Sequence, residues 1–348
     1  MEDKQSHSKL CDDFDYKKKK EERAEISIGG NVVRSFENDP STYNHREIMG
    51  CTFSWGQNNE GQIGSIIDCG FRTHSMLRKK MKMNYPRLIV PLKDTLITGI
   101  ACGHSHTLAI TFEKKVLAWG GNKSCQLGLG DKAPELLTLP HQIEGLTNVK
   151  SVSCGSEHSV ALTEDCMVYS WGSGDGGLLG HGNTQKLTRP KLVETLRNEV
   201  ISSVVCGGLH TLALSKKGYV FSWGRGEGGQ LGHPFEELEK PSDFECYLAK
   251  PKKILKLAEE IYINTVACGD AHSLALGVNG EVYGWGFTNS GQLGTGVTGA
   301  HKDVNSPEIQ VRIPVRIESL RNSQIMQIFS GQTFSMFVND RRDIFGCG

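Results

Sequence analysis

The sequence predicts an all-β fold, a β-propeller of four-stranded blades, because two short motifs recur along the chain. Every tryptophan stands in an aromatic-Ser-Trp-Gly phrase or a close variant of it, and a Gly-x-x-His motif recurs sixteen residues before most of them. Successive tryptophans are 64, 52, 52 and 62 residues apart, and units of about fifty residues are typical of propeller blades. The tryptophans are Trp55, Trp119, Trp171, Trp223 and Trp285.

Further features recur in the same register. A Gly-Gln-Leu-Gly motif or a variant begins six residues after each tryptophan, at Gly61, Cys125, Gly177, Gly229 and Gly291. The Gly-x-x-His motifs end at His106, His158, His210 and His272, and Phe334 takes that place in a fifth copy. Cys102, Cys154, Cys206 and Cys268 precede the glycines of the first four copies. So many features in one register identify a repeat protein.

The unit is expected to contain four short strands. A Pro-x-x-Ile segment is expected to enter an edge strand, where a missing N–H is tolerated. An apolar strand then ends at the cysteine, and a Ser-Leu-Ala-Leu strand follows the histidine. In one copy Asn279-Gly280 predicts the hairpin turn that leads into the tryptophan strand.

These motifs resemble the regulator-of-chromosome-condensation repeats, whose blade carries Cys-Gly-x-x-His-Ser-Leu-Ala-Leu, Val-Tyr-Ser-Trp-Gly and Gly-Gln-Leu-Gly. Residues 155–182 and 269–296 are close copies, and the resemblance covers residues 48–348. It implies a ring of seven blades, whereas this chain contains five full repeats and a partial N-terminal one. Two expectations follow, a fragment of a longer ring truncated at the C-terminus or a smaller, irregular ring.

The domain prediction is a polar, disordered tail over residues 1–46 and a propeller over residues 47–348. Two insertions stand out within the propeller, a basic one at 72–87 and an acidic one at 235–250. Each is expected to be a solvated loop, or else a loop that recruits a partner electrostatically.

The repeated side chains are interpreted as structural, because a fold needs a residue in every blade whereas a site usually needs it once. We expect the histidines to bond a turn within their own blade, the four cysteines to fill small buried spaces, and the tryptophans to anchor the core. No metal site and no cofactor is predicted.

Residues that vary inside the repeated frame are better site candidates. The two positions between Gly and His form a turn on one face of the ring. The resemblance implies that such turns face a small GTPase and that acidic and histidine side chains there matter for nucleotide exchange. The candidates by motif position are His104, Glu157 and Asp270.

The predicted function is non-catalytic protein binding, with two hypotheses left open. One is a guanine-nucleotide exchange factor for a Ran-like small GTPase, which accelerates GDP release without covalent chemistry. The other is a scaffold or adaptor propeller without exchange activity, for which chromatin and the cytoskeleton are the candidate sites of attachment. Enzymes are disfavoured because the chain has no phosphate-binding Gly-Lys-Ser loop, no zinc-spaced His/Glu helix and no nucleophile elbow.

Two further functions depend on the position of the tryptophans and on the charge of the chain. Light sensing through tryptophans in the Gly-x-x-His turns, which a plant protein of this fold uses, is rejected because no tryptophan lies there. Chromatin attachment is supported by a four-lysine block at residues 17–20 and by the basic insertion. The net charge gives it no support, because Lys+Arg and Asp+Glu are equal at 39 each. Without a signal-peptide core or a run of eighteen apolar residues, the protein is expected to be soluble and intracellular, cytoplasmic or nuclear.

Overall fold

The computed structural model describes residues 52–64, 82–242, 245–296 and 310–348. Within these residues the strands form antiparallel sheets that follow one another along the chain. The first sheet pairs β1 (Phe53–Gln57) with β2 (Lys82–Leu88), and five blades follow it.

Blades 1 and 2 have four strands each. Blade 1 contains β3 (Ile97–Cys102), β4 (His106–Thr111), β5 (Val116–Gly121) and β6 (Leu136–Gln142), and blade 2 contains β7 (Val149–Cys154), β8 (His158–Thr163), β9 (Val168–Gly172) and β10 (Leu187–Leu192).

Blade 3 has a fifth strand. It contains β11 (Ile201–Cys206), β12 (His210–Ser215), β13 (Val220–Arg225), β14 (Glu239–Ser242) and β15 (Glu245–Lys253), in the spatial order β11-β12-β13-β15-β14.

Blade 4 contains β16 (Ile263–Cys268), β17 (His272–Gly277), β18 (Val282–Phe287) and β19 (Gln310–Arg316). The fifth repeat appears as three strands that form blade 5, namely β20 (Ile325–Ser330), β21 (Ser335–Asn339) and β22 (Ile344–Cys347).

Helical structure in the described residues is short. The α-helix is α1 (Leu255–Glu260), and the 3-10 turns are Val90–Leu92, Asp175–Gly177, Glu194–Leu196, Phe235–Glu237 and Glu318–Leu320.

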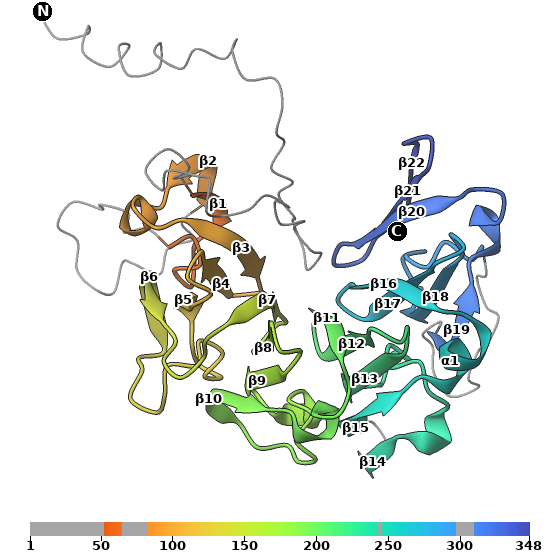
Figure 1. The fold of residues 1–348 in the computed structure, drawn as a ribbon, viewed down its shortest axis with the longest axis horizontal. Coiled ribbons are helices and arrows are strands. Elements are labelled where there is room, and N and C mark those ends of the chain that lie inside the picture. The colour runs from red at the N-terminus through yellow and green to blue at the C-terminus, as the bar shows by residue number, and fades with distance from the viewer. Residues whose placement is uncertain (1–51, 65–81, 243–244, 297–309) are drawn as a thin grey trace, which may run out of the picture.

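The blades are arranged in an arc, with β1–β2 at one end and β20–β22 at the other (Figure 1). The first strands of the blades, β3, β7, β11, β16 and β20, contact one another in sequence and so form the inner side of the arc. The all-β propeller architecture predicted from the sequence is confirmed.

The position of the proline segment differs from the prediction. Pro140 lies late in β6 and Pro314 late in β19, each in the outermost strand of its blade. The proline segment therefore ends a blade and does not enter one. It tolerates proline because one side of an edge strand has no ladder partner, and the ladder shifts register beside it.

Contacts between successive blades build much of the core. The indole Nε1 of Trp171 donates to the carbonyl of Gln126 at 2.9 Å, so a blade 2 side chain docks on the Gln-Leu-Gly turn of blade 1. Gly128 in that turn has φ +70°, and a Cβ there would lie 2.7 Å from the same Nε1. Trp119, Trp223 and Trp285 make the matching bonds to Gln62, Leu178 and Gln230.

Two expectations about buried repeat positions are wrong. Trp55 is 56% exposed, whereas the other four tryptophans are at most 1% exposed. The cause is that a tryptophan docks on the turn of the preceding unit, and no such turn precedes Trp55 among the described residues. Cys102, at the same end of the arc, is exposed and Cys154 is half-buried, whereas Cys206 and Cys268 are buried.

Candidate partner-binding face

The Gly-x-x-His turns join the first and second strands of each blade and therefore lie on one face of the arc. The sequence suggested that their histidine side chains bond a turn of their own blade, and this expectation is wrong. The Nε2 atom of His158 lies 3.0 Å from Oγ1 of Thr211, which is in the second strand of the next blade. His106, His210 and His272 make the same contact with Ser159, Ser273 and Ser335.

We call these four contacts the histidine ladder. The three serines in the ladder each make a second hydrogen bond, donated to the backbone of the preceding blade. Ser159, for example, donates to the carbonyl of Gln126 at 2.7 Å. All four histidines are 0% exposed, and burial lowers the pKa of His106 and His210 to about 3 and that of His158 and His272 to about 4. They are neutral hydrogen-bonding groups at physiological pH.

The backbone of the turns is also bonded from blade to blade. The amide of Ser156 donates to the carbonyl of Gly208 at 3.0 Å, Gly208 donates to Asp270 at 3.0 Å, and Asp270 donates to Gln332 at 2.9 Å. His104 donates to Gly155 at 3.3 Å. The turns are therefore held relative to one another, although they belong to different blades.

The three candidate side chains lie on this face, and each is exposed. Glu157 accepts a hydrogen bond from the hydroxyl of Ser124 at 3.0 Å, and Asp270 accepts one from the side-chain amide of Gln332 at 3.3 Å. Each of the two carboxylates thus has one polar neighbour in an adjoining blade and remains open to solvent. Whether they bind a partner stays a prediction.

An acidic pocket on the same face was missed by the sequence analysis. Arg225 follows the tryptophan phrase of blade 3, and its guanidinium pairs with Asp175 of blade 2 and lies 3.8 Å from Glu227. These side chains line a cavity of about 180 Å³ together with Glu245 and Tyr247. Burial raises the pKa of Glu227. The available signal was the arginine itself, because the other copies carry Gln, Gly, Ser or Phe at that position.

The acidic insertion is a strand pair and not a solvated loop. Strands β14 and β15 extend the sheet of blade 3. Tyr247 of β15 pairs with Arg225, the last residue of β13, and the two residues before it, Glu245 and Cys246, extend beyond the end of β13. The insertion therefore projects at the Gly-x-x-His face. Two of its carboxylates are used locally, since Glu237 pairs with Lys252 at 2.7 Å and Glu239 accepts the amide of Ala249 at 3.0 Å.

The basic insertion falls largely outside the described residues. Of its basic residues, Arg72, Arg78, Lys79 and Lys80 lie there, and Lys82 and Arg87 belong to strand β2. The predicted tail at residues 1–46 also lies outside the described part.

Two other kinds of site are absent from the described ranges. In these ranges no three His, Cys, Asp or Glu side chains come together as metal ligands would. No helix there has the length and apolar character needed to cross a membrane.

The blades repeat along the chain, and hydrogen bonds from tryptophan and histidine side chains join each blade to its neighbour. This arrangement defines a β-propeller with a continuous face of turns. The chain matches the model of the RCC1-like domain over residues 25–258 and that of the regulator of chromosome condensation (RCC1) repeat over residues 263–292 and 279–338. It belongs to the RCC1-like family of propellers, as the sequence motifs predicted.

Individual relatives have different names and sizes. The chain is 34% identical to the ultraviolet-B receptor UVR8 of Arabidopsis thaliana over 85% of its own length and 60% of that protein's. It is 32% identical to the human E3 ubiquitin-protein ligase HERC2, of which it spans 5%.

Among solved structures, the chain resembles Prp20p from Saccharomyces cerevisiae, a protein that binds Gsp1p and histones. The TM-score is 0.68 with 28% identity, over 86% of this chain and 64% of Prp20p. The human protein WBSCR16 has the same fold, with a TM-score of 0.66 and 23% identity.

Proposed function

We propose that the Gly-x-x-His face is a protein-binding surface and that its partner is a small GTPase whose GDP release it accelerates. The observation that carries the proposal is the bonding of turns from blade to blade. A rigid backbone frame presents the exposed side chains of His104, Glu157 and Asp270, so little conformational entropy is lost when a partner binds.

Charge supports a partner with a basic surface. Glu157 and Asp270 lie on the turns, and Asp175, Glu227 and Glu245 line the adjoining pocket, where Arg225 is the one cation among the described lining residues. Complementary charge steers association and sets orientation more than it adds affinity.

The β14–β15 strand pair supports exchange activity in particular. Exchange requires the propeller to favour a GTPase conformation whose Mg²⁺ and phosphate contacts are weakened, which is a matter of differential binding and not of covalent chemistry. The family resemblance implies that one blade supplies an inserted wedge for this purpose. The sequence did not identify such a wedge in this chain, and the β14–β15 pair of blade 3 is an inserted element at the Gly-x-x-His face. The structural similarity to Prp20p, which binds Gsp1p and histones, is consistent with a protein partner.

The test is the release of a fluorescent GDP analogue from a panel of small GTPases, Ran included, with catalytic amounts of the full chain. We expect acceleration that Glu157→Ala and Asp270→Ala each reduce by at least about tenfold, the effect of removing a charged hydrogen bond. Asp165→Ala, in an exposed turn of the opposite face, is the matched control and should retain full activity.

A scaffold without exchange activity is the second candidate, because the same face would bind a partner without altering its nucleotide. It predicts that one of the GTPases, or another basic protein, is retained on the immobilised chain while GDP release is unchanged. Loss of that retention in Glu157→Ala, with normal retention in Asp165→Ala, would identify the face. Absence of both release and retention in a folded sample would refute the proposed face.

A further inference from the structure

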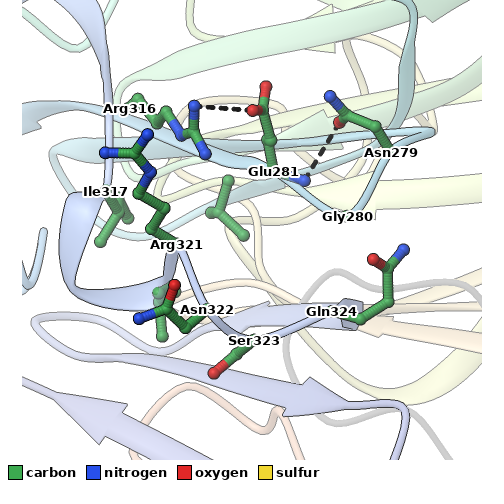
Figure 2. Close-up of a pocket in the computed structure, with 11 residues that line it drawn as sticks. Asn279, Gly280, Glu281, Arg316, Ile317, Arg321, Asn322, Ser323 and Gln324 are labelled. Carbon is green, nitrogen blue, oxygen red and sulfur yellow. Dashed lines mark hydrogen bonds and ion pairs between the residues drawn. The ribbon is translucent and has the colours of Figure 1, made fainter.

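The opposite face of the propeller contains an open groove between blades 4 and 5. It lies between the β17–β18 turn at Asn279-Gly280 and the segment from Arg316 to Gln324, and its volume is about 220 Å³ (Figure 2). A single water needs only roughly 10–15 Å³ of such space, so the groove has room for a small functional group.

Comparison with the preceding junction shows why the groove is open. Between blades 3 and 4 the position of Gln324 is held by Tyr262, whose ring covers Gly218 and whose hydroxyl donates to the carbonyl of Lys216. The connection there forms the six-residue helix α1, whereas three residues, Glu318–Leu320, form the 3-10 turn beside the groove. A shorter connection and an amide in place of an aromatic ring leave the space unfilled.

The groove also differs from its counterparts in charge. Arg316 pairs with Glu281 at 2.7 Å, and Glu318 lies 3.8 Å from the Nε atom of Arg316. Arg321 has no carboxylate partner within the part of the chain that the structure describes. Figure 2 draws Arg321 on the same side of the groove as Arg316, with Asn279 and Gln324 on the other side.

The junction between blades 2 and 3 shows the alternative arrangement. There the equivalent of Arg321 is Arg197, which pairs with Glu194 at 3.1 Å. Leu192 stands at the position of Arg316, so no guanidinium at that position competes with Arg197 for Glu194. Glu199 stands at the position of Ser323 and makes that junction acidic.

Among the described residues the groove is lined by two guanidinium groups and one carboxylate, and Glu281 and Glu318 both face Arg316, so the charge left unbalanced is the +1 of Arg321. One monoanion balances this charge, whereas a phosphate ester of about −1.5 to −2 exceeds it. Asn279 accepts the amide of Glu281 through Oδ1 at 3.1 Å, which leaves its NH₂ group as a donor, and Ser323 and Gln324 supply further donors.

We propose that this groove binds a single carboxylate group, with the guanidinium of Arg321 as its main partner. Arginine matches a carboxylate with two parallel N–H donors, a stronger arrangement than a neutral hydrogen bond. The carboxylate belongs to a small organic acid or to an acidic peptide. The site is independent of the Gly-x-x-His face, since the two lie at opposite ends of the strands.

The test uses saturation-transfer NMR on the full chain with three small probes. N-acetylglycine carries a terminal carboxylate, N-acetylglutamate α-amide carries a peptide side-chain carboxylate, and N-acetylglycinamide is the neutral match. We expect saturable binding of one or both carboxylates and none of the amide. The carboxylate that binds more tightly identifies the source, and inorganic phosphate should compete more weakly.

Variants connect the signal to the groove. Arg321→Gln and Ser323→Glu should each weaken binding by at least about tenfold, because the first removes the cation and the second introduces the acid of the closed junction. Arg197→Gln is the matched control and should bind as the wild type does. Both arginines are exposed, and an unchanged thermal unfolding midpoint verifies each fold.

Several outcomes would overturn the proposal. They are equal binding of N-acetylglycinamide, tighter competition by phosphate, binding that survives Arg321→Gln, or the absence of a saturable signal from either carboxylate.

Discussion

Replacing His158 with glutamine tests the histidine ladder through the pH dependence of stability. His158 is 0% exposed, its Nε2 lies 3.0 Å from the Thr211 hydroxyl, and burial lowers its pKa to about 4. In the unfolded chain a histidine titrates at about 6.5. Because the folded pKa is the lower one, the neutral ladder contributes stability that is present above about pH 6.5. That stability is lost as the pH falls towards 4.

The magnitude follows from the two pKa values. Between about pH 7 and pH 5 the unfolded chain takes up about 0.7 of a proton at this position and the folded chain about 0.1. The free energy of unfolding therefore falls by about 2 kcal/mol for each ladder histidine of this pKa. The wild type has four ladder histidines, two with a pKa of about 4 and two with a pKa of about 3, and His158→Gln removes one of the first two.

The assay is urea unfolding followed by tryptophan fluorescence at about pH 7 and pH 5. At neutral pH we expect His158→Gln to be less stable by about 1–3 kcal/mol, because a buried hydrogen bond is disturbed. Between the two pH values it should lose about 2 kcal/mol less than the wild type does. His104→Gln, which replaces an exposed histidine of the neighbouring turn, is the control and should behave as the wild type at both pH values. An equal acid-induced loss in His158→Gln and the wild type would refute the assignment of a buried, neutral histidine.

Two further substitutions test the contacts between blades. Trp171→Phe removes the 2.9 Å bond from Nε1 to the Gln126 carbonyl and should cost about 1–3 kcal/mol, whereas Trp55→Phe, at an exposed position, should leave the thermal midpoint unchanged. A midpoint in Trp171→Phe equal to that of the wild type would show that the bond contributes nothing. Gly128→Ala combines φ +70° with a Cβ 2.7 Å from the Trp171 Nε1 and should lower the free energy of urea unfolding by more than about 2 kcal/mol. The control Gly145→Ala has φ +76° with nothing within 4 Å, so its loss should be smaller, and equal losses would contradict the steric argument.

Much of the local structure could be predicted because its signals are local and repeated. The Gly-x-x-His motif marks the turn between the first and second strands, and Asn279-Gly280 marks a hairpin, as the structure confirms in β17 and β18. The spacing of the tryptophans determined the size of the blade. These features depend on backbone conformation over a few residues, so the order of amino acids is sufficient to reveal them.

Contacts between blades were decided by the tertiary structure. A residue of one repeat is about fifty positions from its equivalent in the next, and the sequence pattern is the same whether His158 bonds its own blade or Thr211 of the next one. Trp55 illustrates the same limit, since its phrase matches the buried copies and its exposure depends on what packs beside it.

The candidate sites divide in the same way. The motif positions of His104, Glu157 and Asp270 could be identified from the sequence, because they vary inside a constant frame. The pairing of Arg225 with Asp175 and the groove beside Arg321 could not be identified. Each depends on whether a side chain from a neighbouring blade or an insertion fills the space between two blades. Packing decides this, together with which charged groups pair across the junction.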